Sequence, residues 1–528
     1  MKVHYSALLA ALPIALLPGC GGGGENTTFE SSLNGWVQGV YNVPSAELAN
    51  LCSTPRTGLD PYAGNTAYPD KAGSAMNEKM FLRAFSNETY LWYDEIQDQN
   101  PQQFNTVLDY FHSLKTTETT ASGQDKDRFH FTVPYDEYIK SSQSGVVAGF
   151  GFNWSFLNAT APRDIRIAYT EQDSPAALEG VNRGDKLLMI NNVDVVSTNN
   201  PGDIDFINAS LFAPELNTSY QFTFENVDGM PKTVTLTAQD VMTSPVKNAT
   251  VIEHGDKKVG YIQYNAFEPT AQAPLITAFS MLSEQQIDEM VVDLRYNGGG
   301  LVWQSAQVGY MLSGADSNRV FSALHYNDKI MKEVAPGENI YPFLDVAIDW
   351  GKGVLTKQQL PSVNAQRVYV LTTGNTASAS ELLINALRGI DVEVIQIGTP
   401  STGKPYGFAP EQNCGTMYYT IQFKSANEKG FGDFADGFIP TPKSQTSATI
   451  GLDEKVEGCL VADDLTKPLG DSSEGMLAAA LNYISTGECP ALPAASYRAM
   501  SNLNSHQEGA INDLRSPFRT EAIHVDLK

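Results

Sequence analysis

The 528-residue sequence contains few basic side chains and little cysteine or histidine. Its 35 lysines and arginines are outnumbered by 60 acidic residues, which gives a formal net charge of −25. A chain of this charge repels a phosphate backbone, and no basic stripe offsets the repulsion, so nucleic acid is excluded as a main partner. None of the five cysteines forms a C-x-x-C pair and no histidine lies at ligand spacing beside one, so the sequence indicates neither a metal site nor a cofactor.

Apolar runs long enough to cross a bilayer, about 20 residues, are also missing. The stretch Ala7–Leu17 is shorter and follows Lys2, a pattern typical of an export signal. Leu17-Pro18-Gly19-Cys20 resembles a bacterial lipobox, in which the cysteine carries the lipid, and a glycine-rich tether follows it. We therefore expect a protein anchored through Cys20 in the bacterial cell envelope, at the outer membrane and facing the periplasm or the exterior. A plainly cleaved signal with Cys20 as a bystander is the alternative.

The remaining four cysteines are Cys52, Cys414, Cys459 and Cys489. An even number in an exported chain predicts two disulfides, for which three connectivities exist. We favour Cys414–Cys459, with Cys52–Cys489 joining the two ends of the chain.

The length predicts two to four domains, and the first periodic segment reads as helical. Over residues 76–114 apolar side chains recur every three or four positions, and Asn100-Pro101 provides an N-cap and a first-turn proline for a second helix. The polar stretch Lys115–Asp127 predicts a loop.

From about residue 145 to 240 the pattern changes to short alternating strands. Asp228-Gly229 marks a turn between two of them. Ser174-Pro175 starts a single short helix, and a strand, Lys186–Ile190, follows it. These signals predict a small β-rich domain with one short helix.

Strands and helices alternate over residues 250–490, which predicts a largely parallel sheet covered by helices. The expected helices lie near residues 273–283, 302–312 and 380–388. The expected strands are Val259–Ile262, Met290–Leu294, Val368–Leu371 and Val392–Ile395.

Two loops of this region each follow a strand and precede a helix, where ligands bind in open α/β sheets. Asn297-Gly298-Gly299-Gly300 can turn backbone N–H groups into a cleft, as an oxyanion hole requires. Asn375-Thr376-Ala377-Ser378-Ala379-Ser380-Glu381 places serines at the positive end of a helix dipole. A tight turn and an ordinary helix cap are the alternatives.

A hydroxyl nucleophile needs a base, and no histidine falls in a recognisable nucleophile–base motif. Lys404, at the end of Gly398–Lys404, can serve if burial lowers its pKa. The same stretch spells the start of a phosphate-binding loop, but Pro405 stands where the Ser or Thr for magnesium is needed and no helix follows. We therefore reject nucleotide binding.

Together these segments resemble the carboxyl-terminal processing peptidases, also called tail-specific proteases, over residues 76–485. The motifs that carry the resemblance are Asp293-Leu294-Arg295-Tyr296-Asn297-Gly298-Gly299-Gly300, Thr376–Glu381 and Thr402-Gly403-Lys404, with support from Asp436–Pro440 and Asp463–Gly470. The resemblance implies an exported serine endopeptidase that cleaves proteins or peptides through an acyl-enzyme. Ser378 corresponds to the nucleophile and Lys404 to the general base. Ala379, with Gly299 or Gly300, would supply the oxyanion hole.

The resemblance also implies that residues 145–240 form a PDZ-like domain. Its loop Gly149-Phe150-Gly151-Phe152 would bind a substrate's free C-terminus; a glycine-punctuated edge strand is the alternative. Several relatives have a glutamine four residues after the lysine, where this chain has Phe408. A catalytically weak or inactive scaffold that binds protein C-termini therefore stays open as a second function.

The expected fold class is a multidomain α/β protein with an N-terminal helical segment, a PDZ-like β-rich domain and an α/β peptidase core with a largely parallel sheet. The expected boundaries are a signal peptide (1–19), a tether and N-terminal segment (20–75), a helical domain (76–140), the PDZ-like domain (145–240), the core (250–490) and a polar tail (491–528).

Overall fold

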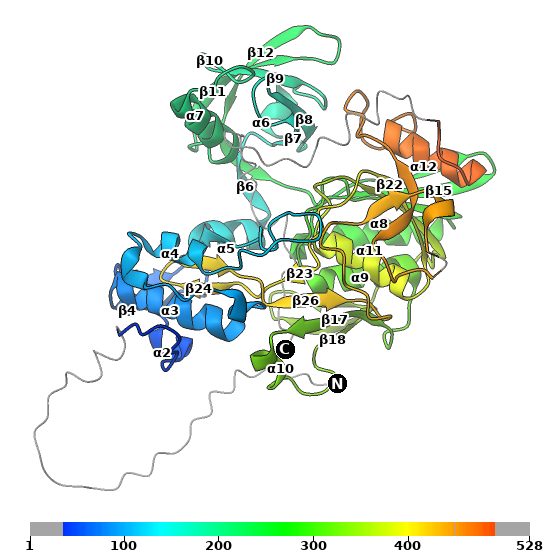
Figure 1. Ribbon diagram of the computed structural model, residues 1–528. Helices are drawn as coiled ribbons and strands as arrows, with labels where there is room; N and C mark the ends of the chain where they lie inside the picture. The colour runs from blue at the N-terminus through cyan, green and yellow to red at the C-terminus, as the bar shows by residue number, and fades with distance from the viewer. Residues whose placement is uncertain (1–34, 448, 492–528) are drawn as a thin grey trace, which may run out of the picture.

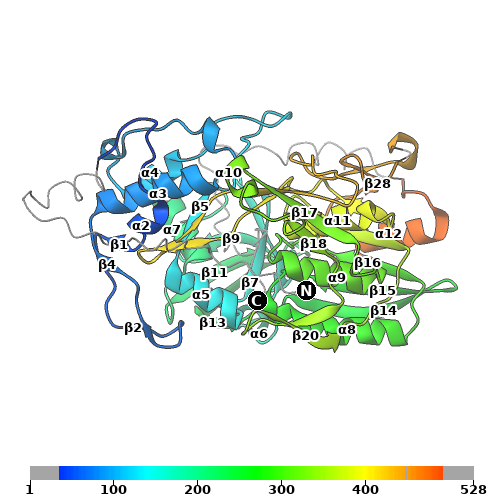
Figure 2. The same ribbon diagram turned by 90° about the horizontal axis from the view of Figure 1, so that it is seen from below.

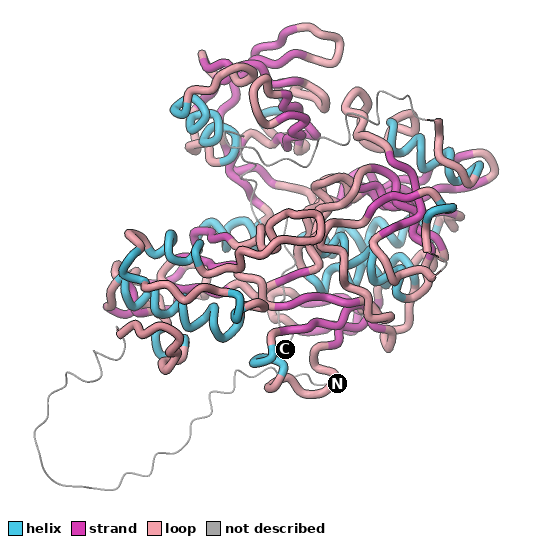
Figure 3. Tube along the Cα trace, in the orientation of Figure 1, coloured by secondary structure: helices cyan, strands magenta, loops and turns pink. Residues whose placement is uncertain are grey.

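The computed structural model describes residues 35–447 and 449–491. The expected signal peptide, Cys20 and nearly all of the polar tail lie outside these ranges. Figure 1 shows three parts that can be told apart: N-terminal helices, a small β-rich domain and a core built on a large sheet. Helices gather at the N-terminal part and around the core sheet, whereas the small domain is mainly strand and loop (Figure 3). Within the described ranges, no helix combines the length and apolar character that a membrane span needs.

The N-terminal part is helical because its apolar stripe packs into a single cluster around Phe81, Phe85 and Phe111. Its longest helix, α3, is capped by Ser74, whose hydroxyl accepts from the N–H of Asn77. The helices are α2 (Ser45–Leu48), α3 (Ala75–Thr89), α4 (Val107–Ser113) and α5 (Tyr135–Ser144), with 3-10 turns η1 (Tyr93–Glu95) and η2 (Pro101–Gln103). Short strands β1 (Leu51–Cys52), β2 (Leu59–Asp60), β3 (Thr66–Ala67) and β4 (Lys71–Ala72) precede α3.

The second helix of this part does not start at Pro101, as the sequence suggested. Asn100 caps only the 3-10 turn η2. The helix α4 begins six residues later, because Thr106 and Asp109 form a reciprocal capping box there.

The small domain is a six-stranded sheet in which β12-β11-β9-β8-β7 are neighbours and β10 pairs with β9. Its strands are β7 (Phe152–Asn158), β8 (Asp164–Thr170), β9 (Lys186–Ile190), β10 (Val193–Asp194), β11 (Ser219–Glu225) and β12 (Pro231–Thr237). The short helix α6 (Pro175–Leu178) begins at the Ser174 cap, as predicted. A second helix, α7 (Pro201–Phe212), was not predicted. It buries Ile207 and Leu211 against the sheet.

An antiparallel pair of strands, β6 (Val146–Gly149) and β13 (Gln239–Met242), joins the small domain to the rest of the chain. The small domain stands away from the body on this pair (Figure 1). Gly145 supports the crossing because its carbonyl accepts from both the N–H and the hydroxyl of Thr243.

The core sheet has the order β14-β15-β16-β21-β22-β28-β27, and all its pairings except β14–β15 are parallel. Alternate residues of each strand face opposite sides: Met290 and Val292 pack with α8, α9 and α11, whereas Val291 packs with α12. The strands are β14 (Val246–His254), β15 (Lys257–Tyr264), β16 (Glu289–Asp293), β21 (Arg367–Thr372), β22 (Glu393–Gly398), β27 (Ile439–Thr441) and β28 (Lys455–Leu460). The helices are α8 (Gln272–Glu284), α9 (Val302–Ser313), α11 (Ala379–Gly389) and α12 (Gly475–Thr486).

Smaller sheets connect the core to the N-terminal helices. In Figure 2 the core lies at one end of the molecule and these helices at the other. One has the order β18-β17-β26-β23, another β24-β25-β5, and β19 pairs with β20. Their strands are β5 (Phe131–Pro134), β17 (Val320–Tyr326), β18 (Ile340–Pro342), β19 (Val346–Asp349), β20 (Val354–Gln359), β23 (Tyr406–Gly407), β24 (Glu411–Asn413), β25 (Thr416–Tyr419) and β26 (Phe423–Ala426). Helix α10 (Asp328–Met331) and 3-10 turns η3 (Pro269–Ala271) and η4 (Lys443–Gln445) complete the described elements.

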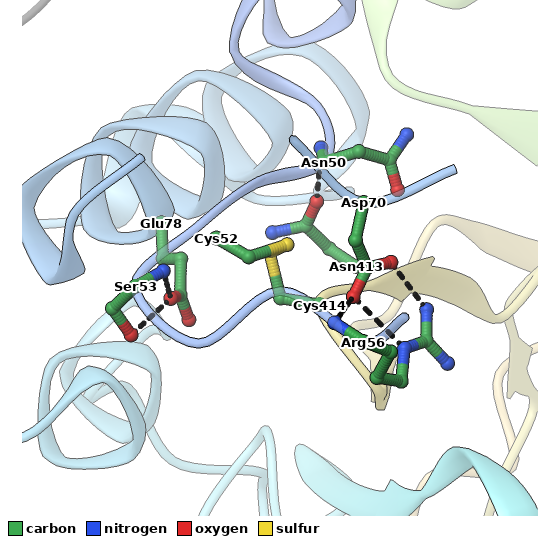
Figure 4. Close-up of a disulfide and its surroundings, with 8 residues drawn as sticks. All are labelled: Asn50, Cys52, Ser53, Arg56, Asp70, Glu78, Asn413 and Cys414. Carbon is green, nitrogen blue, oxygen red and sulfur yellow. Dashed lines mark hydrogen bonds and ion pairs between the residues drawn. A yellow bond between two sulfur atoms is a disulfide. The ribbon is translucent and has the colours of Figure 1, made fainter. Parts of the chain in front are cut away.

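Two disulfides are present, but the expected pairing is wrong. The bonds are Cys52–Cys414 and Cys459–Cys489. Cys414 lies at the tip of the β24–β25 hairpin, which pairs with β5 and so reaches the N-terminal part, where Cys52 lies (Figure 4). Cys489 follows α12, which packs back on the sheet beside β28 and its Cys459.

Candidate active site

Ser378 lies where β21 has ended and α11 begins, and its backbone is bent sharply. Its φ of 60° and ψ of −115° are rarely adopted by a residue with a side chain, and such strain is common at functional sites. The side chain is fully buried, and its Oγ has no hydrogen-bond partner in the part of the chain that the structure describes. A strained, buried hydroxyl at a helix N-terminus is a candidate nucleophile.

The triglycine bend after β16 packs directly against this serine. Gly299 has a φ of 113°, and a methyl group added to it would lie 2.8 Å from Ser378 Cβ and 3.0 Å from Ala379 N. Only a hydrogen atom fits there, so glycine is required. The two loops that the sequence singled out therefore converge.

The N–H groups of the bend are not equivalent. The Gly299 N–H donates to Asn297 Oδ1 at 2.9 Å, while the Asn297 carbonyl accepts from the Ala377 N–H and the Ser380 hydroxyl. Asn297 thus ties the bend to the serine loop and already occupies the Gly299 N–H. Of the two glycines proposed for an oxyanion hole, Gly300 is the favoured donor beside Ala379.

Lys404 lies on the loop between β22 and β23, in an aromatic pocket. Its side chain is fully buried, and Nζ lies 4.4 Å from the centre of the Phe408 ring and 4.8 Å from that of Phe129. Burial lowers the pKa of the Lys404 amine well below its usual value, and the Arg128 guanidinium adds to this lowering, whereas Asp127 and Glu381 oppose it. The pocket therefore favours the neutral amine that a general base needs.

Glu381, in the first turn of α11, connects the loops of the serine and the lysine. Its Oε2 accepts from the backbone N–H of Ser378 at 2.9 Å and of Lys404 at 2.8 Å. Its Oε1 accepts from the Gly403 N–H at 2.7 Å and from the Ser401 hydroxyl at 2.6 Å. Ser401 is the donor in this last bond because its oxygen already accepts from the Phe438 N–H.

Burial raises the pKa of the Glu381 carboxyl, and the four hydrogen bonds act against that rise. Because all four partners are donors, the arrangement binds the ionised carboxylate. One buried carboxylate thus holds Ser378 and Lys404 at a fixed backbone spacing.

The loop Gly149–Phe152 borders a groove in the small domain. The groove lies between the start of β7 and the end of α7. Its lining is mainly apolar and aromatic, including Phe150, Phe152, Trp154, Leu211 and Phe212. Backbone N–H groups beside an apolar recess suit the end of an extended peptide.

Comparison with known proteins agrees with this geometry. Residues 258–422 match the model of peptidase family S41, and residues 77–131 match that of the peptidase S41 N-terminal domain. These two segments of the chain are similar to domains of peptidase family S41. Both matches include residues of the site described above. Phe129 falls in the N-terminal-domain match (77–131), and Ser378, Glu381 and Lys404 fall in the match to the peptidase family (258–422).

Among its relatives, the chain is 25% identical over 267 residues to the carboxyl-terminal-processing protease of Picosynechococcus sp., covering 50% of this chain and 56% of that protein. It is also 25% identical over 386 residues to carboxyl-terminal-processing peptidase 1, chloroplastic, of Arabidopsis thaliana, covering 72% and 71%. The match therefore spans little more than half of the cyanobacterial relative. A crystal structure of a putative S41 protease from Bacteroides fragilis has the same fold, with a TM-score of 0.57, 22% identity and coverage of 80% of this chain and 98% of that one.

Proposed function

We propose that this chain is an exported serine endopeptidase in which Ser378 is the nucleophile and Lys404 the general base. The observation that carries the proposal is the shared oxygen of Glu381, which binds the backbone N–H of both residues. The match to peptidase family S41 supports peptide-bond hydrolysis as the reaction class. Burial of Lys404 supports its role, because a lysine amine accepts a proton at neutral pH only when its pKa is lowered.

In this mechanism the neutral Lys404 amine takes the proton of the Ser378 hydroxyl as Oγ attacks the scissile carbonyl. The oxyanion that forms is bound by the N–H groups of Ala379 and Gly300. The Lys404 ammonium then protonates the leaving amine, and an acyl-enzyme remains on Ser378. Water attacks this ester with Lys404 again as base, and the peptide acid leaves.

Substrate capture would use the groove of the small domain. Its glycine loop supplies backbone donors for a free C-terminal carboxylate, and its aromatic lining accommodates an apolar terminal side chain. A peptide with a free carboxylate should therefore be cleaved with a lower KM than the same peptide amidated at its C-terminus. Equal KM values for the two peptides would contradict this mode of capture.

Export and anchoring rest on the N-terminal signal pattern, and the two disulfides support an oxidising compartment. Replacing Cys20 by serine should yield an exported but soluble product. Membrane association unchanged by Cys20→Ser would refute lipidation.

The direct test of catalysis compares Ser378→Ala with a matched serine variant outside the site. Ser313, at the end of α9, donates to the Gly309 carbonyl and serves as the control. Ser378→Ala should abolish hydrolysis of a fluorogenic peptide while Ser313→Ala retains it. Peptide binding without hydrolysis in the unmodified protein would instead favour the scaffold function, which the replacement of a glutamine by Phe408 keeps open.

A further inference from the structure

The loop that carries Lys404 is held from two sides by different parts of the chain. On the core side its N–H groups, those of Gly403 and Lys404, donate to Glu381. On the opposite side its carbonyl groups accept from Arg128, which belongs to the N-terminal part. The peptide units beside the lysine thus have both their donors and their acceptors occupied by buried or half-buried charged groups.

Arg128 makes these contacts through one nitrogen of its guanidinium. Nη2 lies 2.8 Å from the Thr402 carbonyl, 3.3 Å from the Gly403 carbonyl and 3.3 Å from the Ala435 carbonyl. Its partners therefore belong to two separate core loops, which meet at this side chain. The two N–H groups of Nη2 are shared among these three carbonyl oxygens.

The residues on either side of Arg128 are fixed as well. Asp127 is fully buried and accepts from the Tyr90 hydroxyl at 2.7 Å and from the Phe129 N–H at 3.0 Å. Phe129 follows, and its ring forms one wall of the lysine pocket. The side chain of Arg128 is thus delivered to the core by a segment that has little freedom of its own.

A second set of contacts docks the same segment on the core. The Thr120 hydroxyl donates to Asp436 Oδ1 at 2.8 Å, and Ser122 donates to the same carboxylate through its hydroxyl and its N–H. Asp436 is the neighbour of Ala435, which Arg128 contacts. The N-terminal segment and the loops around Lys404 therefore form one continuous hydrogen-bonded interface.

We propose that Arg128 is a positioning residue for the base, through which the N-terminal domain completes the peptidase site. It holds the Thr402–Lys404 loop, which carries the base, in place through the Thr402 and Gly403 carbonyls. Several relatives use for the orientation of the lysine a glutamine that stands where this chain has Phe408. The inference rests on the proposed function. It assigns to the N-terminal domain a part in catalysis without contact with the substrate.

Removing the arginine changes two quantities that can be separated. Its geometry fixes the loop, and its positive charge lowers the pKa of Lys404. The charged groups that act on Lys404 are Asp127, Glu381 and Arg128. Those that act on Arg128 are Glu381, Asp436, Tyr406 and Asp125.

The test is the pH dependence of kcat/KM for Arg128→Gln and Arg128→Lys in the full chain. Arg128→Gln removes both the guanidinium that contacts the carbonyl groups and its positive charge, so kcat/KM should fall about 10- to 100-fold. Its limb of rising activity should also move to higher pH, because the pKa of Lys404 is no longer lowered by the cation. Arg128→Lys keeps the charge, so its limb should stay in place while kcat falls.

The control is Arg166→Gln, since Arg166 is a half-buried arginine of the small domain that pairs with Asp164. It should keep both the rate and the pH profile. The inference would be overturned if Arg128→Gln had the wild-type kcat/KM and if its kcat/KM rose over the same pH range as that of the wild type. If Arg128→Gln does not fold, a folded Arg128→Lys with full kcat overturns it equally. Activity that persists in Lys404→Ala would contradict the proposed function itself, whatever the Arg128 variants do.

Discussion

Replacement of Glu381 by glutamine perturbs the connection between the loops of Ser378 and Lys404 with the smallest change of shape. An amide keeps only one of the two carboxylate oxygens, so two of the four donors must face an NH₂ group. The Ser401 hydroxyl can turn to accept from that group, but the Gly403 N–H cannot. The amide is therefore expected to place its nitrogen on the Oε1 side and to leave a buried N–H without an acceptor.

The cost follows from these contacts. Hydrogen bonds to a charged acceptor contribute about 1.5–3 kcal/mol each, and a stranded buried donor costs about 1–3 kcal/mol. Glu381→Gln should therefore lower the free energy of unfolding by about 3 kcal/mol. The kcat should fall about 10- to 100-fold, since a shift of about 1 Å in a catalytic group reduces the rate by up to about 100-fold.

Urea unfolding measures the free energy of unfolding. Steady-state hydrolysis of a fluorogenic peptide, per folded molecule, measures kcat. Glu78→Gln is the matched control, because Glu78 is also buried and accepts from the N–H and hydroxyl of Ser53 at 2.7 Å through a single oxygen (Figure 4). A glutamine there keeps both bonds, so kcat should not change. Wild-type stability and wild-type kcat in Glu381→Gln would refute the positioning role of this carboxylate.

Three further predictions follow from other parts of the structure. Lys404→Met should be more stable than the wild type at pH 7, and the difference in stability should shrink as pH rises towards 10.5, because the unfolded lysine binds a proton that the folded one releases. A difference in urea unfolding that stays constant with pH would contradict the lowered pKa of Lys404. The Cys52–Cys414 bond joins residues 362 positions apart, and its removal by serine replacement should lower stability by about 2–4 kcal/mol. Non-reducing peptide mapping of the unmodified protein should find these two cysteines linked, and a different linkage would contradict the fold. Gly299→Ala should reduce kcat about 100-fold, since its methyl would lie 2.8 Å from Ser378 Cβ, whereas Gly351→Ala, with 3.5 Å to its nearest neighbour, should not.

The core could be predicted from the sequence because its helices and strands have complete local signals. The three expected helices begin and end within one residue of α8, α9 and α11. The helix α7 was missed although Asn200-Pro201 offers a cap and Ile204, Ile207 and Leu211 follow at helical spacing. The sequence analysis assigned only one short helix, at Ser174-Pro175, to this β-rich domain, although the helical signal of α7 is present in the sequence.

The disulfide pairing and the surroundings of Lys404 could not be predicted in the same way. Both depend on contacts between residues hundreds of positions apart: Cys52 with Cys414, and Arg128 with the Thr402 carbonyl. No local pattern specifies such contacts, since they arise only when the β24–β25 hairpin pairs with β5 and brings the N-terminal part to the core. Glu381 was visible as a helix cap, but its bonds to Gly403 and Lys404 required the fold.

The most direct test of the central claim is covalent labelling with a serine-reactive phosphonate probe, followed by mass spectrometry of a tryptic digest. The site described here predicts one modified peptide, Val368–Arg388, with the label on Ser378. Labelling should disappear in Ser378→Ala and should be slowed strongly in Lys404→Ala. A probe that labels another serine, or hydrolysis that persists in Ser378→Ala, would contradict the claim that this strained hydroxyl is the nucleophile.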